Sequence, residues 1–144
     1  ISVSLFSNKI YAQTETNEKT TSKEKNEISF SEVDVVPRFT ECKNAAKEDA
    51  MKCFNDKMME HIKTNFTYPK EAAKKNIQGQ VSIQFIIDKE GNIRDIITRG
   101  PENGELLEVE AKRIVSLLPK FIPAKHNGKT VNIKYGLPIT FKLK

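Results

Sequence analysis

The stretch Val131-Asn-Ile-Lys-Tyr-Gly-Leu-Pro-Ile-Thr-Phe-Lys-Leu143 decides the fold, because an apolar residue fills every odd position and none of the even ones is a large aliphatic or aromatic residue. A period of two is typical of a β-strand with one buried face and one face in water. Pro138 cannot donate a hydrogen bond to a neighbouring strand, so we expect this part of the strand at a sheet edge or at a bulge. The pattern predicts a sheet that is covered on one face.

Two further strands are expected before this one, joined as a hairpin. The first, over 79–87, has a wholly apolar face, because its odd positions from 81 onward are Val, Ile, Phe and Ile. The second runs from about residue 92 to residue 99. Gly91 lies between them and supplies the positive φ that a short hairpin turn needs.

Three segments are expected to be helices. Apolar residues recur at steps of three and four over 47–65, which is typical of an amphipathic helix. A short helix over 70–75 is expected after Tyr68-Pro69, because proline suits the first helical position. A third helix lies between 105 and 118. From residue 69 onward, this order predicts an α+β two-layer sandwich, with helices on one face of a three-stranded antiparallel sheet.

The N-terminal part differs in composition from the rest. The 144 residues have room for one ordinary domain and a tail. Residues 1–13 look like the end of a secretory signal, and 14–46 are expected to be a flexible leader that contains an extended segment and Cys42, since 14–27 hold no aliphatic residue. The helix over 47–65 then precedes the main domain at 66–144.

Cys42 and Cys53 are the whole cysteine inventory. An even number in an exported chain favours a disulfide, with two free buried thiols as the alternative. A zinc site would have to recruit His61 and His126, but that spacing matches no compact set of zinc ligands. We therefore predict a disulfide between Cys42 and Cys53, and neither a metal nor a cofactor.

The charge is uneven along the chain. The net charge is +5, and 112–144 contain eight Lys or Arg residues without any Asp or Glu. A basic patch attracts phosphate backbones, so a nucleic-acid or anionic-surface binding module that uses this basic C-terminal third is the alternative function. Lysines at alternate strand positions are also an ordinary solvated face. The chain has no Trp, and its aromatic residues fall largely on the predicted core face.

The sequence does not indicate an enzyme. It has only two His residues, its Ser residues gather near the N-terminus, and no nucleophile, base and orienting acid converge by spacing. Asp88, Glu90 and Asp95 surround the predicted hairpin and are better explained as solvated turn residues. We predict no catalytic residues.

Several short motifs together resemble the TonB C-terminal domain family. They are Tyr68-Pro69, Ile77-Gln-Gly79-Gln-Val81, Phe85-Ile-Ile-Asp88-Lys-Glu-Gly91, Leu118-Pro119-Lys-Phe-Ile-Pro123-Ala, Gly128-Lys-Thr-Val131 and Leu137-Pro138-Ile-Thr-Phe141. The resemblance covers about 66–144, and the stretch around the two cysteines resembles a version of the family with an N-terminal extension. It implies a periplasmic domain, in energy-coupled transport, that adds a short extended peptide of an outer-membrane transporter to its sheet as a strand.

An edge strand suits this mode, because its unpaired backbone groups give affinity and alternate side chains give selectivity. We expect the partner on the last strand, with lysines that steer an acidic segment; the residues are Lys129, Val131, Asn132, Ile133, Lys134 and Tyr135. The same edge allows a homodimer. The sequence shows neither a membrane-spanning anchor nor a Pro-rich spacer, so membrane contact is expected only through partners or through an anchor upstream of Ile1.

Overall fold

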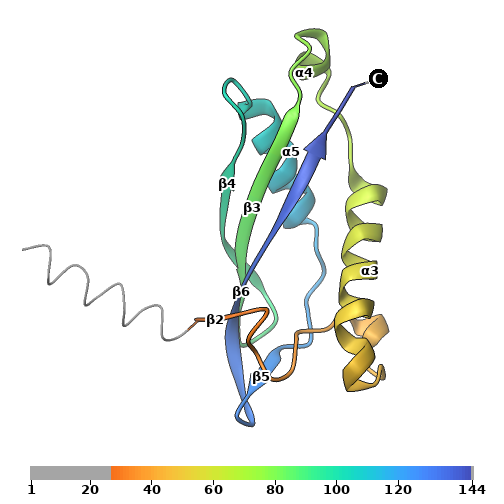
Figure 1. The fold of residues 1–144 in the computed structure, drawn as a ribbon, viewed down its shortest axis with the longest axis vertical. Helices are drawn as coiled ribbons and strands as arrows, with labels where there is room; N and C mark the ends of the chain where they lie inside the picture. The colour runs from red at the N-terminus through yellow and green to blue at the C-terminus, as the bar shows by residue number, and fades with distance from the viewer. Residues whose placement is uncertain (1–26, 144) are drawn as a thin grey trace, which may run out of the picture.

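A computed structural model describes residues 27–143 of the protein. The predicted signal remnant at 1–13, and the predicted leader up to residue 26, lie outside these residues. The elements are β2 (Glu27–Ser29), the short 3₁₀ helix η1 (Thr40–Cys42), α3 (Lys47–Asn65), α4 (Lys70–Lys74), β3 (Gly79–Ile87), β4 (Ile93–Arg99), α5 (Glu105–Ser116), β5 (Ala124–His126) and β6 (Lys129–Phe141). Figure 1 shows their arrangement.

The sheet confirms the α+β fold class but has more strands than predicted. Its order is β2-β6-β3-β4, and β5 pairs with β6 in addition, which makes five strands instead of three. β3 pairs antiparallel with both β4 and β6, whereas β2 is parallel to β6. β6 extends beyond the stretch from Ile133 to Phe141 that β3 reaches, and β5 pairs with part of this extension, whereas β2 pairs with residues 132–134 on the side of β6 away from β3.

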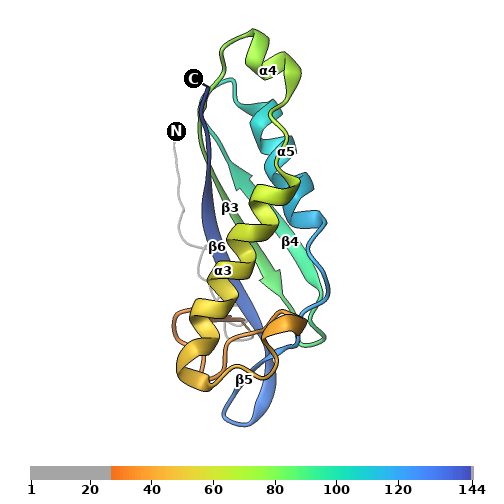
Figure 2. The same ribbon diagram turned by 90° about the vertical axis from the view of Figure 1, so that its right-hand side faces the viewer.

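The two long helices, α3 and α5, cover one face of the sheet, as predicted (Figure 2). α3 buries Ala50, Phe54, Met58 and Ile62 at steps of four residues. β3 buries its odd positions from Val81 to Ile87, and these side chains form one core cluster with those of α3 and α5. Burying a large apolar side chain contributes about 1.5–3 kcal/mol, so this shared cluster is the main stabilising term of the fold.

The segment before α3 is packed onto the rest of the molecule. Val36, Pro37 and Phe39 are buried, and the backbone makes bridges from Val35 to Lys125 and from Arg38 to Ile122. One nitrogen of the Arg38 guanidinium, Nη1, donates to the carbonyl oxygens of residues 42, 43 and 45 at 3.1, 3.0 and 2.8 Å. Residues 33–46 thus follow a defined path, with backbone bridges to residues 122 and 125.

The predicted disulfide between Cys42 and Cys53 is present, with a Cα–Cα distance of 6.1 Å. It joins η1 to α3, and Cys42 is buried in the core. The covalent bond therefore connects the N-terminal extension to the helix that covers the sheet.

Polar contacts fix the position of α3 and its connection to α4 against α5. Glu110 is 7% exposed, and its carboxylate accepts two hydrogen bonds from Arg113 at 2.8 Å and another from the Thr67 N–H at 2.8 Å. The hydrogen bond from Arg113 to Glu110 raises the pKa of the guanidinium. His61 Nε2 lies 2.8 Å from the Ile114 carbonyl oxygen, so α3 is held at its C-terminal half.

Candidate functional site

The six predicted partner-binding residues lie on β6, but their backbone is already paired within the chain. Residues 129–131 pair with β5, residues 132–134 pair with β2, and residues 133–135 also pair with β3. This part of β6 is therefore not the free edge that the sequence predicts, because the N-terminal extension and the segment after α5 cover it. Partner contact at Lys129, Val131, Asn132, Ile133, Lys134 and Tyr135 stays a prediction, since the structure contains no partner.

Two of the six side chains pack into the core: Ile133 is fully buried, and Tyr135 is partly buried among aromatic rings. Its ring contacts those of Phe30, Phe54 and Phe85, with centroid distances of 4.9, 5.1 and 5.6 Å. This burial raises the pKa of its phenol. Tyr135 is therefore bound into the aromatic part of the core, which the alternation of β6 also predicts.

The open part of the β6 edge begins beyond Lys134. The Phe30 N–H donates to the Lys134 carbonyl oxygen at 3.1 Å, so the backbone groups of Lys134 point away from β3. Successive residues of a strand point their backbone groups to opposite sides. The groups of Gly136, Pro138 and Thr140 consequently also point away from β3, and within 27–143 no strand pairs with them there.

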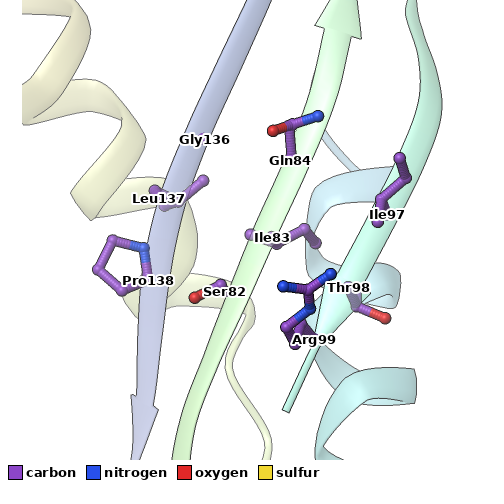
Figure 3. A pocket seen from close by; sticks show the side chains of 9 residues that line it. All are labelled: Ser82, Ile83, Gln84, Ile97, Thr98, Arg99, Gly136, Leu137 and Pro138. Carbon is purple, nitrogen blue, oxygen red and sulfur yellow. The ribbon is translucent and has the colours of Figure 1, made fainter.

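Pro138 fits this geometry. It lies opposite Ser82 in the register, and its ring is on the side of β6 remote from β3 (Figure 3). Since its missing N–H would point outward, β6 loses no hydrogen bond to β3. Among residues 27–143, β3 alone pairs with β6 at Pro138, so of the predicted edge or bulge the structure shows an edge there.

A groove runs beside this open edge, between it and the C-terminal half of α3. Its lining is mostly apolar and consists of Met59, Ile62, Lys63, Phe66, Pro138, Ile139 and Thr140. Met59 is 52% exposed, so its side chain is accessible to a bound segment. A strand laid along the open edge would place alternate side chains toward this groove. The sequence did not predict this groove, because its lining comes from segments that are distant in the sequence.

The charge beside the groove is positive. Lys63 is the one charged residue in its lining, and Lys142 follows the end of β6. An acidic side chain on a bound segment would gain from these ammonium groups, while exposed pairs of this kind contribute less than about 1 kcal/mol. The charge thus favours encounter and orientation more than affinity.

The opposite edge of the sheet, on β4, is less suited to pairing. The register of β3 and β4 shifts between Gln84 and Ile86, and Asp95 has a φ of 57°. Arg94 and Asp95 form an ion pair of 2.6 Å at this bulge. Bulges and charged side chains are common means of blocking an edge, so β6 offers the more regular edge.

The face of the sheet away from the helices carries a shallow hollow (Figure 3). It is lined by Ser82, Gln84, Ile97, Arg99 and Gly136, among others. Arg99 is its sole charged lining residue, and Ile97 is 57% exposed. No set of polar groups converges there, so the hollow lacks the features of a small-molecule site.

Features of other functional classes were sought within residues 27–143. No three His, Cys, Asp or Glu side chains come together there as metal ligands would. None of the helices in that range is long and apolar enough to cross a membrane. Phe54, Phe85, Phe121 and Phe141 are buried in the core, so these rings do not form a surface on which nucleic-acid bases could stack.

Comparisons with known proteins identify related domains. The family model described as Gram-negative bacterial TonB protein C-terminal matches residues 64–143. Two matching solved structures are solution NMR structures of the TonB C-terminal domain of Helicobacter pylori. One is 26% identical, covers 71% of this chain and 87% of that one, and has a TM-score of 0.42. The other is 28% identical, covers 62% and 94%, and has a TM-score of 0.39. No curated protein sequence matches the chain.

Proposed function

The chain belongs to the family of Gram-negative bacterial TonB protein C-terminal domains, and we propose that it binds an extended segment of an outer-membrane transporter by strand addition. In this proposal the domain acts in the periplasm, in energy-coupled transport, and its role is binding instead of catalysis. The partner strand pairs with β6 from Gly136 onward, which moves the docking edge along β6 from the segment predicted by sequence.

The observation that carries the proposal is the open edge of β6 next to an apolar groove. Main-chain pairing with the N–H and C=O groups of Gly136 and Thr140, and with the C=O group of Pro138, supplies affinity that is independent of the partner's sequence. Side chains that enter the groove between α3 and β6 supply selectivity, because a large apolar side chain buried there contributes about 1.5–3 kcal/mol. A short strand therefore gains enough from both sources for reversible binding.

An oxidising compartment is part of the proposal. The disulfide between Cys42 and Cys53 is typical of exported proteins. The signal-like composition of residues 1–13 agrees with export. We accordingly propose that the mature protein works outside the cytoplasm.

The direct test is an NMR titration of the isotope-labelled protein with peptides from the plug regions of TonB-dependent transporters. We expect the largest amide shifts at Gly136 and Thr140, and much smaller shifts along β4. Thr140→Pro should weaken binding by at least about tenfold, because it removes an outward donor and adds a ring to the edge without breaking a hydrogen bond to β3. Thr140→Val keeps the N–H and is the matched control.

Other outcomes of the titration would contradict the proposal. Shifts confined to β4 would place the docking edge on the other side of the sheet. Concentration-dependent shifts at Gly136 and Thr140 without any peptide would identify a homodimer that uses this edge. Binding to DNA or to anionic vesicles that falls steeply with salt, with no response to peptides, would support the basic-surface function instead.

A further inference from the structure

β2 occupies the part of the β6 edge that adjoins the open part. It pairs in parallel with Asn132, Ile133 and Lys134, and the Phe30 N–H extends the pairing by one hydrogen bond to Lys134. β2 is thus an intramolecular example of an extended segment added to this same edge. The next outward-pointing residue of β6 is Gly136, where the open edge begins.

The chain leaves the edge abruptly after Phe30. The N–H groups of Glu32 and Val33 both donate to the Ser29 carbonyl oxygen, at 2.9 and 3.2 Å. This tight turn carries the chain away from β6. A strand that approached along the open edge from Thr140 toward Gly136 would therefore meet the turn at its end.

Phe30 is well anchored at this position. Its ring lies 4.8 Å from the centroid of Phe54 and 4.9 Å from that of Tyr135. The residues that follow are held by the pairing of Val35 with Lys125 and by the disulfide at Cys42. Displacing β2 from the edge would thus disturb the aromatic core as well as a few hydrogen bonds.

We propose that β2 and the turn after Phe30 act as an end stop, which limits the added strand to the edge from Gly136 to the end of β6. This inference rests on the proposed function and specifies its partner. The free length corresponds to about six residues, or about 20 Å at the usual rise of a strand. The partner segment is therefore short and extended, with an apolar side chain for the groove and an acidic side chain near Lys63.

A peptide length series tests the end stop. The probes are synthetic peptides that begin with Glu and then alternate Ile and Ser. This pattern copies the Glu27-Ile-Ser29 strand, which pairs with β6. The peptides are about four, six, eight and ten residues long. With the wild-type chain, affinity should rise up to about six residues and then level off. The exchange rate of the Lys134 amide hydrogen should stay unchanged on binding.

Two variants remove the stop in different ways. Phe30→Pro deletes the donor to Lys134 and the anchoring ring, whereas Ile28→Pro weakens β2 and leaves the ring in place. In either variant the ten-residue peptide should bind about tenfold more tightly than the six-residue peptide, with new shifts at Asn132 and Lys134. Ser31→Ala, an exposed change in the same turn, is the control and should behave as the wild type.

The outcomes separate this inference from the proposed function. If long peptides bind the wild type more tightly and accelerate exchange at Lys134, β2 is displaced and the end stop is wrong, while strand addition stands. If both proline variants keep their fold, judged by unchanged β3 amide shifts, and still show the plateau, the stop is also wrong. If no peptide, whether of this series or from a transporter, shifts the amides of β6, the proposed function itself is wrong.

Discussion

Gly91 is the residue where backbone conformation and packing leave the least freedom. Its φ is +89°, and an added Cβ would lie 1.9 Å from the Phe121 carbonyl oxygen. The Phe121 N–H also donates to the Gly91 carbonyl oxygen at 2.9 Å. The hairpin glycine that the sequence marks as a turn residue therefore also joins the β3–β4 turn to the segment after α5.

We expect Gly91→Ala to lower the free energy of unfolding by about 3 kcal/mol or more, through both the clash and the strained φ. Gly128→Ala is the matched control, because its φ is +80° with no atom within 4 Å of the added Cβ. That change should cost only about 1 kcal/mol. Urea denaturation of the two variants measures the difference, and equal losses would show that the contact with Phe121 is unimportant.

Glu110 is the buried charged group among residues 27–143. Glu110→Ala should lower the free energy of unfolding by about 2–3 kcal/mol, because the Thr67 N–H loses its acceptor and Arg113 its partner. Glu110→Gln keeps one acceptor oxygen and should lose less. Thermal unfolding checks both against Glu105→Ala, an exposed change in the first turn of α5 that should cost about 0.5 kcal/mol. A loss for Glu110→Ala no larger than this would contradict the role of the contact.

Among the elements, the disulfide-linked extension makes the most distinctive contribution. The double variant Cys42→Ser, Cys53→Ser should lose about 3 kcal/mol, because the unfolded chain gains the entropy that the short closed loop removes. Hydrogen exchange should accelerate more for β2 and its neighbours on β6 than for the β3–β4 hairpin. Wild-type protein under reducing conditions should match the variant, and a variant as stable as the oxidised wild type would show that packing alone holds the extension.

The longer elements were predictable from the sequence because each contains several periods of its pattern. The periodicity predicts a helix over 47–65, and α3 spans Lys47–Asn65. β2 and β5 have three residues each, too few for any period to be recognised. Their existence depends on pairing with β6 across a long stretch of chain, as between Glu27 and Asn132, and no local pattern contains that information.

The candidate site was partly predictable for the same reason. Pro138 indicates an edge from its own chemistry, and the structure confirms it. Which part of β6 stays open depends on where the N-terminal extension lies, so the sequence placed the docking residues in the part that β2 and β5 cover. The groove depends on the angle at which α3 crosses the sheet, which side-chain packing sets.

At the scale of the whole molecule, one aromatic centre joins the extension, the helix layer and the sheet. Phe54 is 0% exposed, and its ring lies within 5.8 Å of four other aromatic rings, measured between centroids. These rings come from segments that are distant in sequence, namely Phe30, Phe39, Phe121 and Tyr135. Such a shared core favours unfolding in a single cooperative step.

Phe54→Ala should therefore lower the free energy of unfolding by about 3–5 kcal/mol and do so across the molecule. Hydrogen exchange should accelerate by similar factors for the backbone near Phe39 and for the centre of β3. Met59→Ala, an exposed change on the same helix, should stay within about 0.5 kcal/mol of the wild type. Acceleration restricted to the extension would show that it unfolds as a separate unit.

Pro138 has a consequence for how the protein behaves at high concentration. An exposed strand is a template for polymerisation, in which copies stack side by side into fibres. With a proline in the middle of the open edge, a copy of β6 laid against it meets a missing donor and a protruding ring at its centre. We expect this proline to disfavour the long continuous pairing that a fibre needs, while a short segment can still bond to the backbone of Gly136 and Thr140.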